Sequence, residues 1–230
     1  MARYERKLIL PRSARSELNS FIRLHPARFS SIYRPRHINN IYFDTPLFRN
    51  FFDSTEGFSQ RSKVRIRWYG DLFGEIAQPK LELKGKSGVV GIKNNYVLPV
   101  LELHEKHVEI HVADCLKDAG LPDEVLQLMT TMQPVLMNRY LREYWRSADG
   151  NYRLTVDSEL HFFALKRFSG IAFQTRRDHR KVIVEMKYDS EFDSGAPDIT
   201  QHFPVRLGKC SKYVMGIERL YRGYAEIPPD

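Results

Sequence analysis

Cationic and apolar residues alternate strictly along the segment Lys63-Val64-Arg65-Ile66-Arg67-Trp68. Successive side chains of an extended strand point to opposite faces. This segment therefore predicts a strand with three cations on one face and three apolar groups on the other. A polar outer face is the ordinary pattern of a half-buried antiparallel strand, so one such strand does not yet predict a site.

The same alternation recurs along the chain, and bases and carboxylates share the polar faces of the predicted strands. These faces hold Arg3, Glu5 and Lys7; Glu82, Lys84 and Lys86; Arg153, Thr155, Asp157 and Glu159; and Lys181, Glu185 and Lys187. Faces of this kind, spread over the whole sequence, can converge inside a barrel and line a charged interior.

The hydrophobic pattern predicts a strand-rich chain that is interrupted by helices. Strands are predicted at residues 3–10, 37–43, 62–69, 80–86, 92–99, 135–146, 152–160, 163–173 and 180–188. Helical spacing or turn signals predict helices within 14–22, 47–56, 103–120 and 121–132. About eight strands with several helices indicate an α+β fold, and an antiparallel barrel would leave no exposed sheet edges.

Length and charge narrow the picture further. A chain of 230 residues has the length of one large domain, so we expect a single domain over residues 1–230. The formal net charge of +8 and the sequence pI near 9.4 favour a polyanionic partner. Charge alone leaves nucleic acid, an anionic membrane and a phosphorylated small molecule open.

Cysteine content and hydropathy bear on the cellular compartment. Cys115 and Cys210 are too few and too far apart to suggest a disulfide framework or a metal cluster, which fits a reducing compartment. No run approaches the roughly 20 apolar residues that span a bilayer, and the first seven residues lack an apolar signal core. We therefore expect a cytoplasmic protein.

A face lined by arginine and lysine has the chemistry of a phosphate site. Guanidinium presents a bidentate fork of donors and ammonium a concentrated charge, so several cations in series match a linear chain of phosphates. Carboxylates on the same faces need another reason. Either they pair with neighbouring bases, or they hold a divalent cation that bridges phosphate oxygens.

Eight short segments carry a family resemblance through their order and spacing. They are residues 3–7 (RYERK), 41–45 (IYFDT), 64–70 (VRIRWYG), 81–84 (LELK), 138–142 (NRYLR), 154–157 (LTVD), 184–187 (VEMK) and 211–213 (SKY). Together they resemble the VTC domain, the polyphosphate polymerase domain of vacuolar transporter chaperone complexes. That domain is placed in the CYTH-like superfamily of triphosphate tunnel metalloenzymes, and the resemblance covers nearly the whole chain.

The resemblance implies an eight-stranded antiparallel β-barrel with peripheral helices, whose tunnel binds triphosphate or polyphosphate. It matches these residues to phosphate-binding positions: Lys7, Arg65, Arg67, Lys84, Lys93, Tyr140, Arg142, Arg153, Ser211 and Lys212. Six of them are also expected to act in catalysis: Arg65, Arg67, Lys84, Arg142, Arg153 and Lys212. Glu185 matches the metal-binding carboxylate, Glu5 is a weaker second ligand, and the expected metal is Mn²⁺ or Mg²⁺.

The implied reaction transfers the terminal phosphate of ATP to a growing polyphosphate chain. One departure favours this reaction: the hydrolytic branch opens with Glu-x-Glu-x-Lys, whereas Arg3 occupies the first acidic position here. A cation there would weaken a carboxylate cluster that positions water.

A metal-dependent inorganic or nucleoside triphosphatase and a non-catalytic polyphosphate-binding module stay open as alternatives. Specific nucleic acid is not an expected partner, whereas a separate membrane partner and the oligomeric state stay open.

Overall fold

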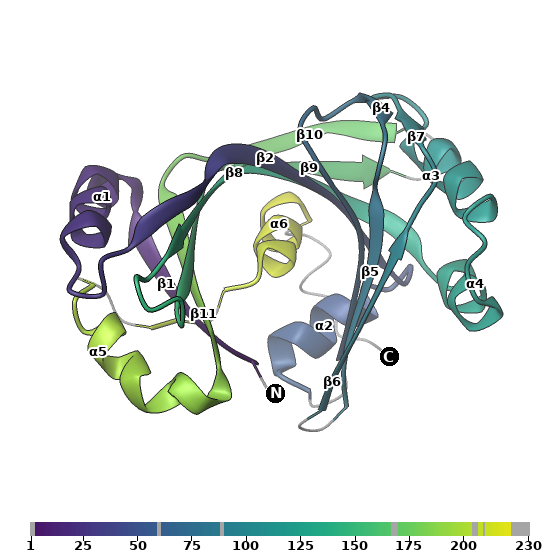
Figure 1. Ribbon diagram of the computed structural model, residues 1–230. Coiled ribbons are helices and arrows are strands. Elements are labelled where there is room, and N and C mark those ends of the chain that lie inside the picture. Colours follow the sequence, from purple (N-terminus) through teal and green to yellow (C-terminus); the bar gives the residue numbers. More distant parts are fainter. Residues whose placement is uncertain are drawn as a thin grey trace. The chain divides into compact units, whose positions relative to one another are not determined.

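The computed structural model describes residues 3–58, 61–87, 90–166, 170–203, 207–208 and 210–221, without the side chains of 61, 86, 87, 90–93, 166 and 170–174. The strands are β1 (Arg3–Pro11), β2 (Ser30–Asp44), β3 (Arg61–Tyr69), β4 (Gly74–Ile76), β5 (Lys80–Ser87), β6 (Val90–Val97), β7 (Leu101–Leu103), β8 (Gln133–Arg146), β9 (Arg153–Lys166), β10 (Gly170–Asp178) and β11 (Lys181–Asp189) (Figure 1). The α-helices are α1 (Arg15–Leu24), α2 (Arg49–Glu56), α3 (Val108–Lys117), α4 (Asp123–Thr130), α5 (Ala196–Thr200) and α6 (Lys212–Leu220).

Nine strands form one large sheet with the hydrogen-bonded order β1-β11-β9-β8-β2-β3-β5-β6, and β10 pairs with β9. β4 and β7 form a separate two-stranded sheet. The pairs β1/β11, β11/β9, β2/β3, β3/β5 and β5/β6 are all antiparallel. The predicted α+β class and the antiparallel pairing are therefore confirmed. The main sheet has nine strands in place of the eight expected, and within the described residues no pairing of β1 with β6 closes it into a barrel.

The chain divides into two compact units, and β2, β8, β9 and β10 each contribute residues to both. Unit 1 consists of Met1–His37, Tyr140–Leu160 and Arg177–Cys210. Unit 2 consists of Ile38–Arg139, His161–Arg176 and Ser211–Asp230. Each unit has its own hydrophobic cluster, so each is described by itself.

In unit 1, alternate residues of β1 and β11 turn toward the core. Leu8, Leu10, Val184 and Met186 are at most 1% exposed, and they pack with Leu18 and other apolar residues in one cluster. Antiparallel register places Lys7 opposite Glu185 and Glu5 opposite Lys187. Because side chains alternate along a strand, burial of the apolar set fixes these charged residues on the other face.

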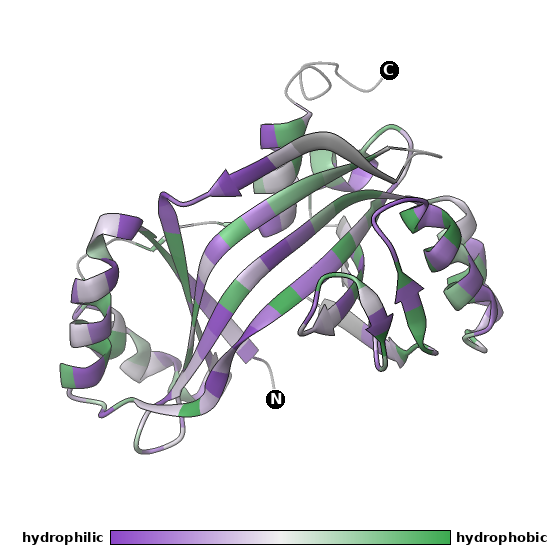
Figure 2. Cartoon of the chain, turned by 90° about the horizontal axis from the view of Figure 1, so that it is seen from above, coloured by the Kyte–Doolittle hydropathy of each residue, from purple (hydrophilic) through white to green (hydrophobic). Residues whose placement is uncertain are grey.

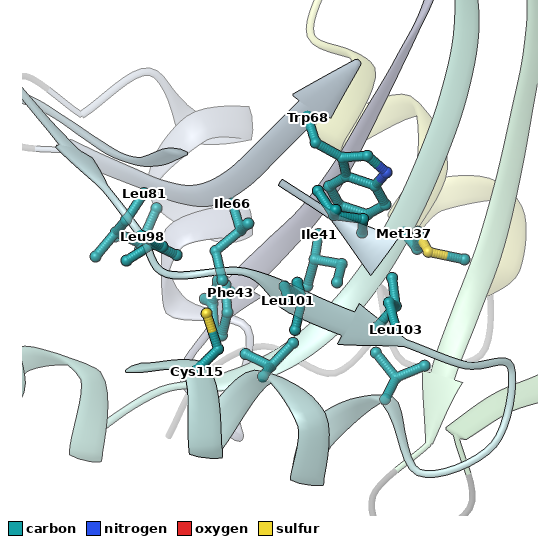
Figure 3. Packing of buried hydrophobic residues seen from close by; sticks show 14 of the residues in the cluster. Ile41, Phe43, Ile66, Trp68, Leu81, Leu98, Leu101, Leu103, Cys115 and Met137 are labelled. Carbon is teal, nitrogen blue, oxygen red and sulfur yellow. The ribbon is translucent and has the colours of Figure 1, made fainter. Parts of the chain in front are cut away.

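In unit 2, buried apolar side chains likewise alternate with polar ones along the strands. Val64, Ile66 and Trp68 of β3 are at most 1% exposed and belong to a cluster that α3 and α4 also enter (Figure 3). Cys115 of α3 is buried in this cluster, as expected for a structural thiol. Hydrophilic and hydrophobic residues alternate visibly along the strands (Figure 2). The apolar half of the pattern thus builds the core, and the polar half remains on the opposite face.

Some predicted elements differ from the structure. One strand at 163–173 is wrong, because β9 continues to Lys166 and β10 begins at Gly170. Helix α6 was not predicted, although Ser211 is a favourable N-cap residue and Tyr213, Ile217 and Leu220 have helical spacing. No helix within the described residues has both the length and the apolarity needed to cross a membrane.

Gly216 lets α6 approach the sheet of unit 2 closely. A Cβ atom at this position would lie 2.5 Å from Leu136 Cδ2 and 2.9 Å from Phe162 Cδ1. Glycine in a helix interior lowers helix stability by about 1 kcal/mol relative to alanine. The close approach of α6 to the sheet is the physical reason that glycine occupies this position. The packing of α6 in turn sets the position of Ser211 and Lys212 at its N-terminus.

We predict that Gly216→Ala lowers the free energy of unfolding by about 1–3 kcal/mol, because overpacking outweighs the gain in helix propensity. Urea denaturation measures the change. Glu218→Ala, on the exposed side of the same helix, is the matched control and should shift stability by less than about 0.5 kcal/mol. Stabilisation by Gly216→Ala would contradict the close packing.

Candidate functional site

Cations occupy neighbouring positions across β3, β5 and β6 of unit 2. Lys63 is the register partner of Lys84, and Lys84 is in turn the register partner of Lys93. The side chain of Lys93 lies outside the described residues, so its predicted phosphate contact has no described geometry. Like charges directly opposite each other destabilise a sheet. Such a row indicates a surface that binds anions.

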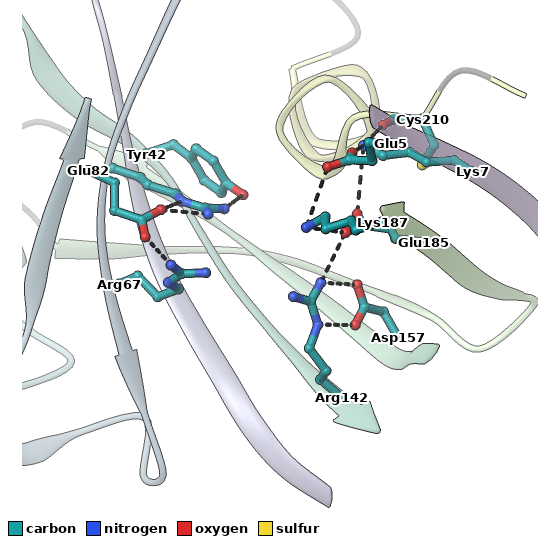
Figure 4. Close-up of polar contacts among 11 residues, drawn as sticks. Glu5, Lys7, Tyr42, Arg67, Glu82, Arg142, Asp157, Glu185, Lys187 and Cys210 are labelled. Carbon is teal, nitrogen blue, oxygen red and sulfur yellow. Dashed lines mark hydrogen bonds and ion pairs between the residues drawn. The ribbon is translucent and has the colours of Figure 1, made fainter. Parts of the chain in front are cut away.

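Glu82 joins two arginines one row further along β3 and β5 (Figure 4). Arg65 Nε donates to Glu82 Oε2 at 2.8 Å, and Arg67 pairs with Glu82 Oε1. Arg65 Nη1 also donates to the Tyr42 hydroxyl at 3.3 Å. Glu82 is 1% exposed, whereas the two arginine side chains are 16% and 18% exposed. The arginines are therefore held parallel on one face while their guanidinium groups keep contact with solvent.

The charge of Glu82 is stabilised by its partners. Burial raises the pKa of this carboxyl, but Arg65 and Arg67 together lower it further, so the net pKa lies below its ordinary value. Glu82 is thus ionised at neutral pH. The carboxylate reduces the repulsion between the arginines without cancelling both of their charges.

The N-terminus of α6 brings two more predicted site residues into unit 2. Ser211 caps the helix by accepting from Val214 N at 3.4 Å, and Lys63 Nζ donates to the same Ser211 Oγ at 3.2 Å. Lys212 is the first residue of the helix and is 9% exposed. Ser211 therefore lies within hydrogen-bonding distance of the lysine row.

Asp44 fixes this helix end in place. Its carboxylate accepts from the backbone N of Thr45, Asn50 and Phe51 at 2.7 to 3.0 Å and from the Tyr213 hydroxyl. Burial raises the pKa of Asp44, although these donors act in the opposite direction. Asp44 belongs to the segment 41–45 of the family resemblance, and its contacts give it a positioning role.

In unit 1, Glu185 lies among three cations (Figure 4). Its Oε1 is 3.6 Å from Lys7 Nζ, and its Oε2 is 3.4 Å from Lys187 Nζ and 3.5 Å from Arg142 Nη2. Glu5 shares the two lysines, with Oε1 2.8 Å from Lys7 Nζ and Oε2 3.4 Å from Lys187 Nζ. The two predicted metal ligands are therefore neighbours that the same lysines bridge.

The electrostatics of Glu5 follow from this arrangement. Burial and the nearby Glu185 raise the pKa of the Glu5 carboxyl, but Lys187 and Lys7 lower it more, and the net pKa is below its ordinary value. The two carboxylates can remain charged side by side because the lysines stand between them. Lys7 Nζ also donates to the Cys210 carbonyl at 2.9 Å.

Arg142 is held more rigidly than the lysines. Its Nε and Nη2 donate to the two carboxylate oxygens of Asp157 at 2.5 and 2.6 Å, and its guanidinium lies 5.3 Å from the centre of the Tyr140 ring. Arg142 is 8% exposed and Asp157 is fully buried. Burial lowers the pKa of Arg142, but Tyr140, Asp157 and Glu185 raise it well above its ordinary value, so this arginine stays charged.

Two residues of β9 complete the charged face of unit 1. Arg153 is exposed and is the register partner of Lys187, and Thr155 is the register partner of Glu185. The Thr155 hydroxyl oxygen is buried without a hydrogen-bond partner among the described residues. Thr155 therefore adds an unsatisfied oxygen next to the row that holds Glu185.

The carboxylates of unit 1 meet only part of what a divalent cation needs. Carboxylate and hydroxyl oxygens are the ligand type that Mg²⁺ and Mn²⁺ prefer. However, no group of three or more His, Cys, Asp or Glu residues within the described part of the chain is arranged around a common metal position. The oxygens of Glu185 and Glu5 fit the metal in kind, but lysines and Arg142 occupy their surroundings.

The structure thus brings the predicted residues into two charged faces and adds partners that the sequence analysis did not assign to the site. In unit 2 these are Tyr42, Lys63 and Glu82, and in unit 1 they are Asp157 and Lys187. The sequence could have identified four of them, namely Lys63, Glu82, Asp157 and Lys187. Each lies two or four positions from a predicted site residue on the same strand and therefore on the same face. Tyr42 differs, because it contacts Arg65 across strands.

Comparison with known proteins identifies the family. The model of the VTC domain matches residues 2–221. The chain belongs to the VTC domain family. This match confirms the resemblance drawn from the eight sequence segments. None of the curated proteins compared with this VTC domain matches its sequence.

Two solved structures resemble this VTC domain over most of its length. The PH1819 protein of Pyrococcus horikoshii is 16% identical, with 94% of this chain and 99% of that chain covered and a TM-score of 0.49. A candidate adenylate cyclase of Vibrio parahaemolyticus is 10% identical, with the same coverage and a TM-score of 0.50. The second likeness extends to the fold alone.

We predict that Glu82→Gln lowers the free energy of unfolding at pH 7 by about 1–3 kcal/mol, because two guanidinium groups lose their shared charge. A carboxyl whose pKa is lowered by folding stabilises the protein above its ordinary value of 4.5, and this contribution is lost as pH falls through the lowered pKa. The difference from wild type should therefore shrink in acid.

Urea denaturation at neutral pH and at about pH 3 measures both differences. Glu56→Gln, at an exposed position of α2, is the control and should change stability by less than about 0.5 kcal/mol. If Glu82→Gln lost equal stability at the two pH values, the shape of the side chain rather than its charge would be responsible.

Proposed function

We propose that this VTC domain is a metal-dependent polyphosphate polymerase that transfers the terminal phosphate of ATP to a growing polyphosphate chain. The observation that carries the proposal is the excess of cations on the face of unit 2. Among the described side chains of β3 and β5, five cations share this face with Glu82: Lys63, Arg65, Arg67, Lys80 and Lys84. An excess of this size matches a ligand with many negative charges in series.

A linear phosphate chain fits this face better than a single anion does. Cations at alternate positions of a strand recur about every 6–7 Å, so successive rows can contact successive parts of one extended chain. Arginine adds bidentate contacts to phosphate oxygens, and Ser211 adds a hydroxyl beside Lys63. We propose phosphate contacts in unit 2 for Arg65, Arg67, Lys84, Lys93, Ser211 and Lys212, and in unit 1 for Lys7, Tyr140, Arg142 and Arg153.

The proposed reaction requires no covalent intermediate on the protein. An oxygen of the acceptor's terminal phosphate forms the new P–O bond to the γ-phosphorus of ATP, and the bond to the β-phosphate oxygen breaks, releasing ADP. Catalysis then consists of aligning the phosphates and neutralising their oxygens. The assigned catalytic residues, Arg65, Arg67, Lys84, Arg142, Arg153 and Lys212, supply permanent positive charge for this purpose.

Glu185 and Glu5 would hold a divalent cation, Mn²⁺ or Mg²⁺, which would supply positive charge to the phosphates during transfer. Glu185 and Glu5 are the proposed ligands, because their side chains are adjacent and lie on the charged face of unit 1. In the described arrangement both carboxylates contact lysines.

Arg3 favours polymerisation over hydrolysis. Its Nε lies 3.3 Å from Asp189 Oδ1, at the strand position where the hydrolytic branch carries a glutamate. A cation here reduces the negative charge that would gather metal and water, and it favours an anionic acceptor. A metal-dependent triphosphatase is the second candidate, because the same residues would also align ATP for attack by water.

We further propose that residues 1–230 act as one domain in the cytoplasm.

The direct test is the product. Purified protein is incubated with ATP and Mn²⁺, with and without a polyphosphate primer, and the products are separated by length. Polymerase activity predicts long chains together with ADP. Release of orthophosphate alone would assign the triphosphatase activity, and tight polyphosphate binding without turnover under Mn²⁺ or Mg²⁺ would assign a binding module.

We predict that Lys84→Ala weakens binding of tripolyphosphate by about 1–2 kcal/mol, because one charge-assisted phosphate contact is lost. The unfolding free energy should change by less than about 0.5 kcal/mol, because Lys84 is exposed and its attraction to Glu82 opposes its repulsion from the lysines in register. Calorimetric titration and urea denaturation measure the two quantities. Lys117→Ala removes an exposed lysine of α3 and is the control, with unchanged affinity. A stability loss without an affinity loss would make Lys84 a structural residue.

We predict that Glu185→Gln abolishes most metal-dependent turnover but retains tripolyphosphate binding, because the amide keeps the shape and loses the charge that holds a hard cation. Product formation and ligand binding are followed separately while Mn²⁺ is titrated. The same Mn²⁺ dependence in wild type and variant would remove Glu185 from the metal site.

A further inference from the structure

The carboxylates of unit 1 are already balanced by cations of the same unit. Glu5, Glu185 and Asp157 contribute three negative charges, and Lys7, Lys187 and Arg142 contribute three positive ones within the distances of ion pairs. Both carboxylate oxygens of Glu5 and both of Glu185 lie within 3.6 Å of a cationic nitrogen. A metal ion placed at these oxygens would therefore lie a few ångströms from ammonium groups and be repelled.

Arg142, Lys7 and Lys187 differ in how firmly their contacts hold them beside the carboxylates. Arg142 is fixed by two hydrogen bonds to the fully buried Asp157. The side chains of Lys7 and Lys187 are 23% and 33% exposed and have long flexible stems, and Lys7 also donates to the Cys210 carbonyl at 2.9 Å. Each ammonium group has three donors, so it can direct one of them toward another anion. An incoming phosphate chain is such an anion. The lysines, rather than the arginine, are therefore the groups that a phosphate ligand can draw away from the carboxylates.

Departure of the lysines would leave two carboxylates side by side. Lys187 and Lys7 offset the repulsion between Glu5 and Glu185, which share them as partners. Without these lysines, a divalent cation is the natural replacement. The buried Thr155 oxygen, opposite Glu185 in register and without a hydrogen-bond partner among the described residues, offers a further ligand of the same type.

We propose that Glu5 and Glu185 become a divalent metal site only when a phosphate chain engages Lys7 and Lys187, so that phosphate and metal bind this domain with positive cooperativity. The inference rests on the proposed function, which supplies the phosphate chain. Because coupling between two ligands is reciprocal, metal should strengthen phosphate binding by the same factor. In the absence of phosphate the lysines act as internal substitutes for the metal.

The first experiment uses Mn²⁺ alone. Mn²⁺ is titrated into wild type, Lys187→Gln and Lys7→Gln, and free Mn²⁺ is followed by electron paramagnetic resonance. Each lysine variant should bind Mn²⁺ more tightly than wild type, by a factor within the range of about 5 to 150 that is usual for such coupling. The double variant Lys187→Gln/Glu185→Gln should lose the gain, which locates it at Glu185.

The second experiment adds tripolyphosphate, which chelates Mn²⁺ in its own right. Wild type and Glu185→Gln are therefore compared at the same ligand concentrations, so that the chelation cancels in the difference. Wild type should retain more Mn²⁺ than Glu185→Gln when tripolyphosphate is present, and the two proteins should be equal when it is absent.

The outcomes separate this inference from the proposed function. Tight Mn²⁺ binding by wild type without phosphate, lost in Glu185→Gln, would overturn the coupling while leaving a phosphate-binding enzyme. Unchanged Mn²⁺ affinity in both lysine variants would overturn it as well. Failure of wild type to bind tripolyphosphate would instead overturn the proposed function, and the phosphate trigger with it.

Discussion

Burial of one face of each strand is the constraint on which the charged faces depend. A strand exposes opposite faces with a period of two, so a register slip of one residue would move its apolar set to solvent and its charges into the core. In β3 this would exchange Ile66, which is fully buried, with Arg65 or Arg67. In β11, where Glu185 is itself only 7% exposed, a slip would place its carboxylate in the apolar cluster that holds Val184 and Met186. The hydrophobic core thereby holds charged side chains at positions that their own repulsion would oppose.

The two units resolve that repulsion in different ways. In unit 2, Glu82 is shared between two arginines while lysines stand opposite each other in register, so positive charge is left in excess. In unit 1, carboxylates and cations balance through shared ion pairs. An anionic ligand should therefore relieve repulsion in unit 2, whereas in unit 1 it must compete with existing partners. On the proposed function, phosphate would thus add directly to the face of unit 2, whereas the proposed phosphate contacts of unit 1 would replace existing ion pairs.

The sequence predicts the strand faces better than the contacts between them. Alternation within β3 is a local property, so the common face of Arg65 and Arg67 follows from the sequence. The position of Glu82 between them depends on the register of β3 against β5, which no local pattern contains. Pairing of Arg142 with Asp157 depends in the same way on the packing of β8 against β9. The phosphate and metal roles came from the family resemblance and stay proposals.

The affinity of the protein for phosphate chains of increasing length tests the account most directly. Orthophosphate, pyrophosphate, tripolyphosphate and longer polyphosphate are titrated into the protein by calorimetry at one salt concentration, because electrostatic affinity depends on salt. Cations arranged in successive rows predict that affinity rises with each added phosphate up to at least tripolyphosphate. Equal affinity for orthophosphate and tripolyphosphate would contradict the account, since the charged faces would then hold one anion at most.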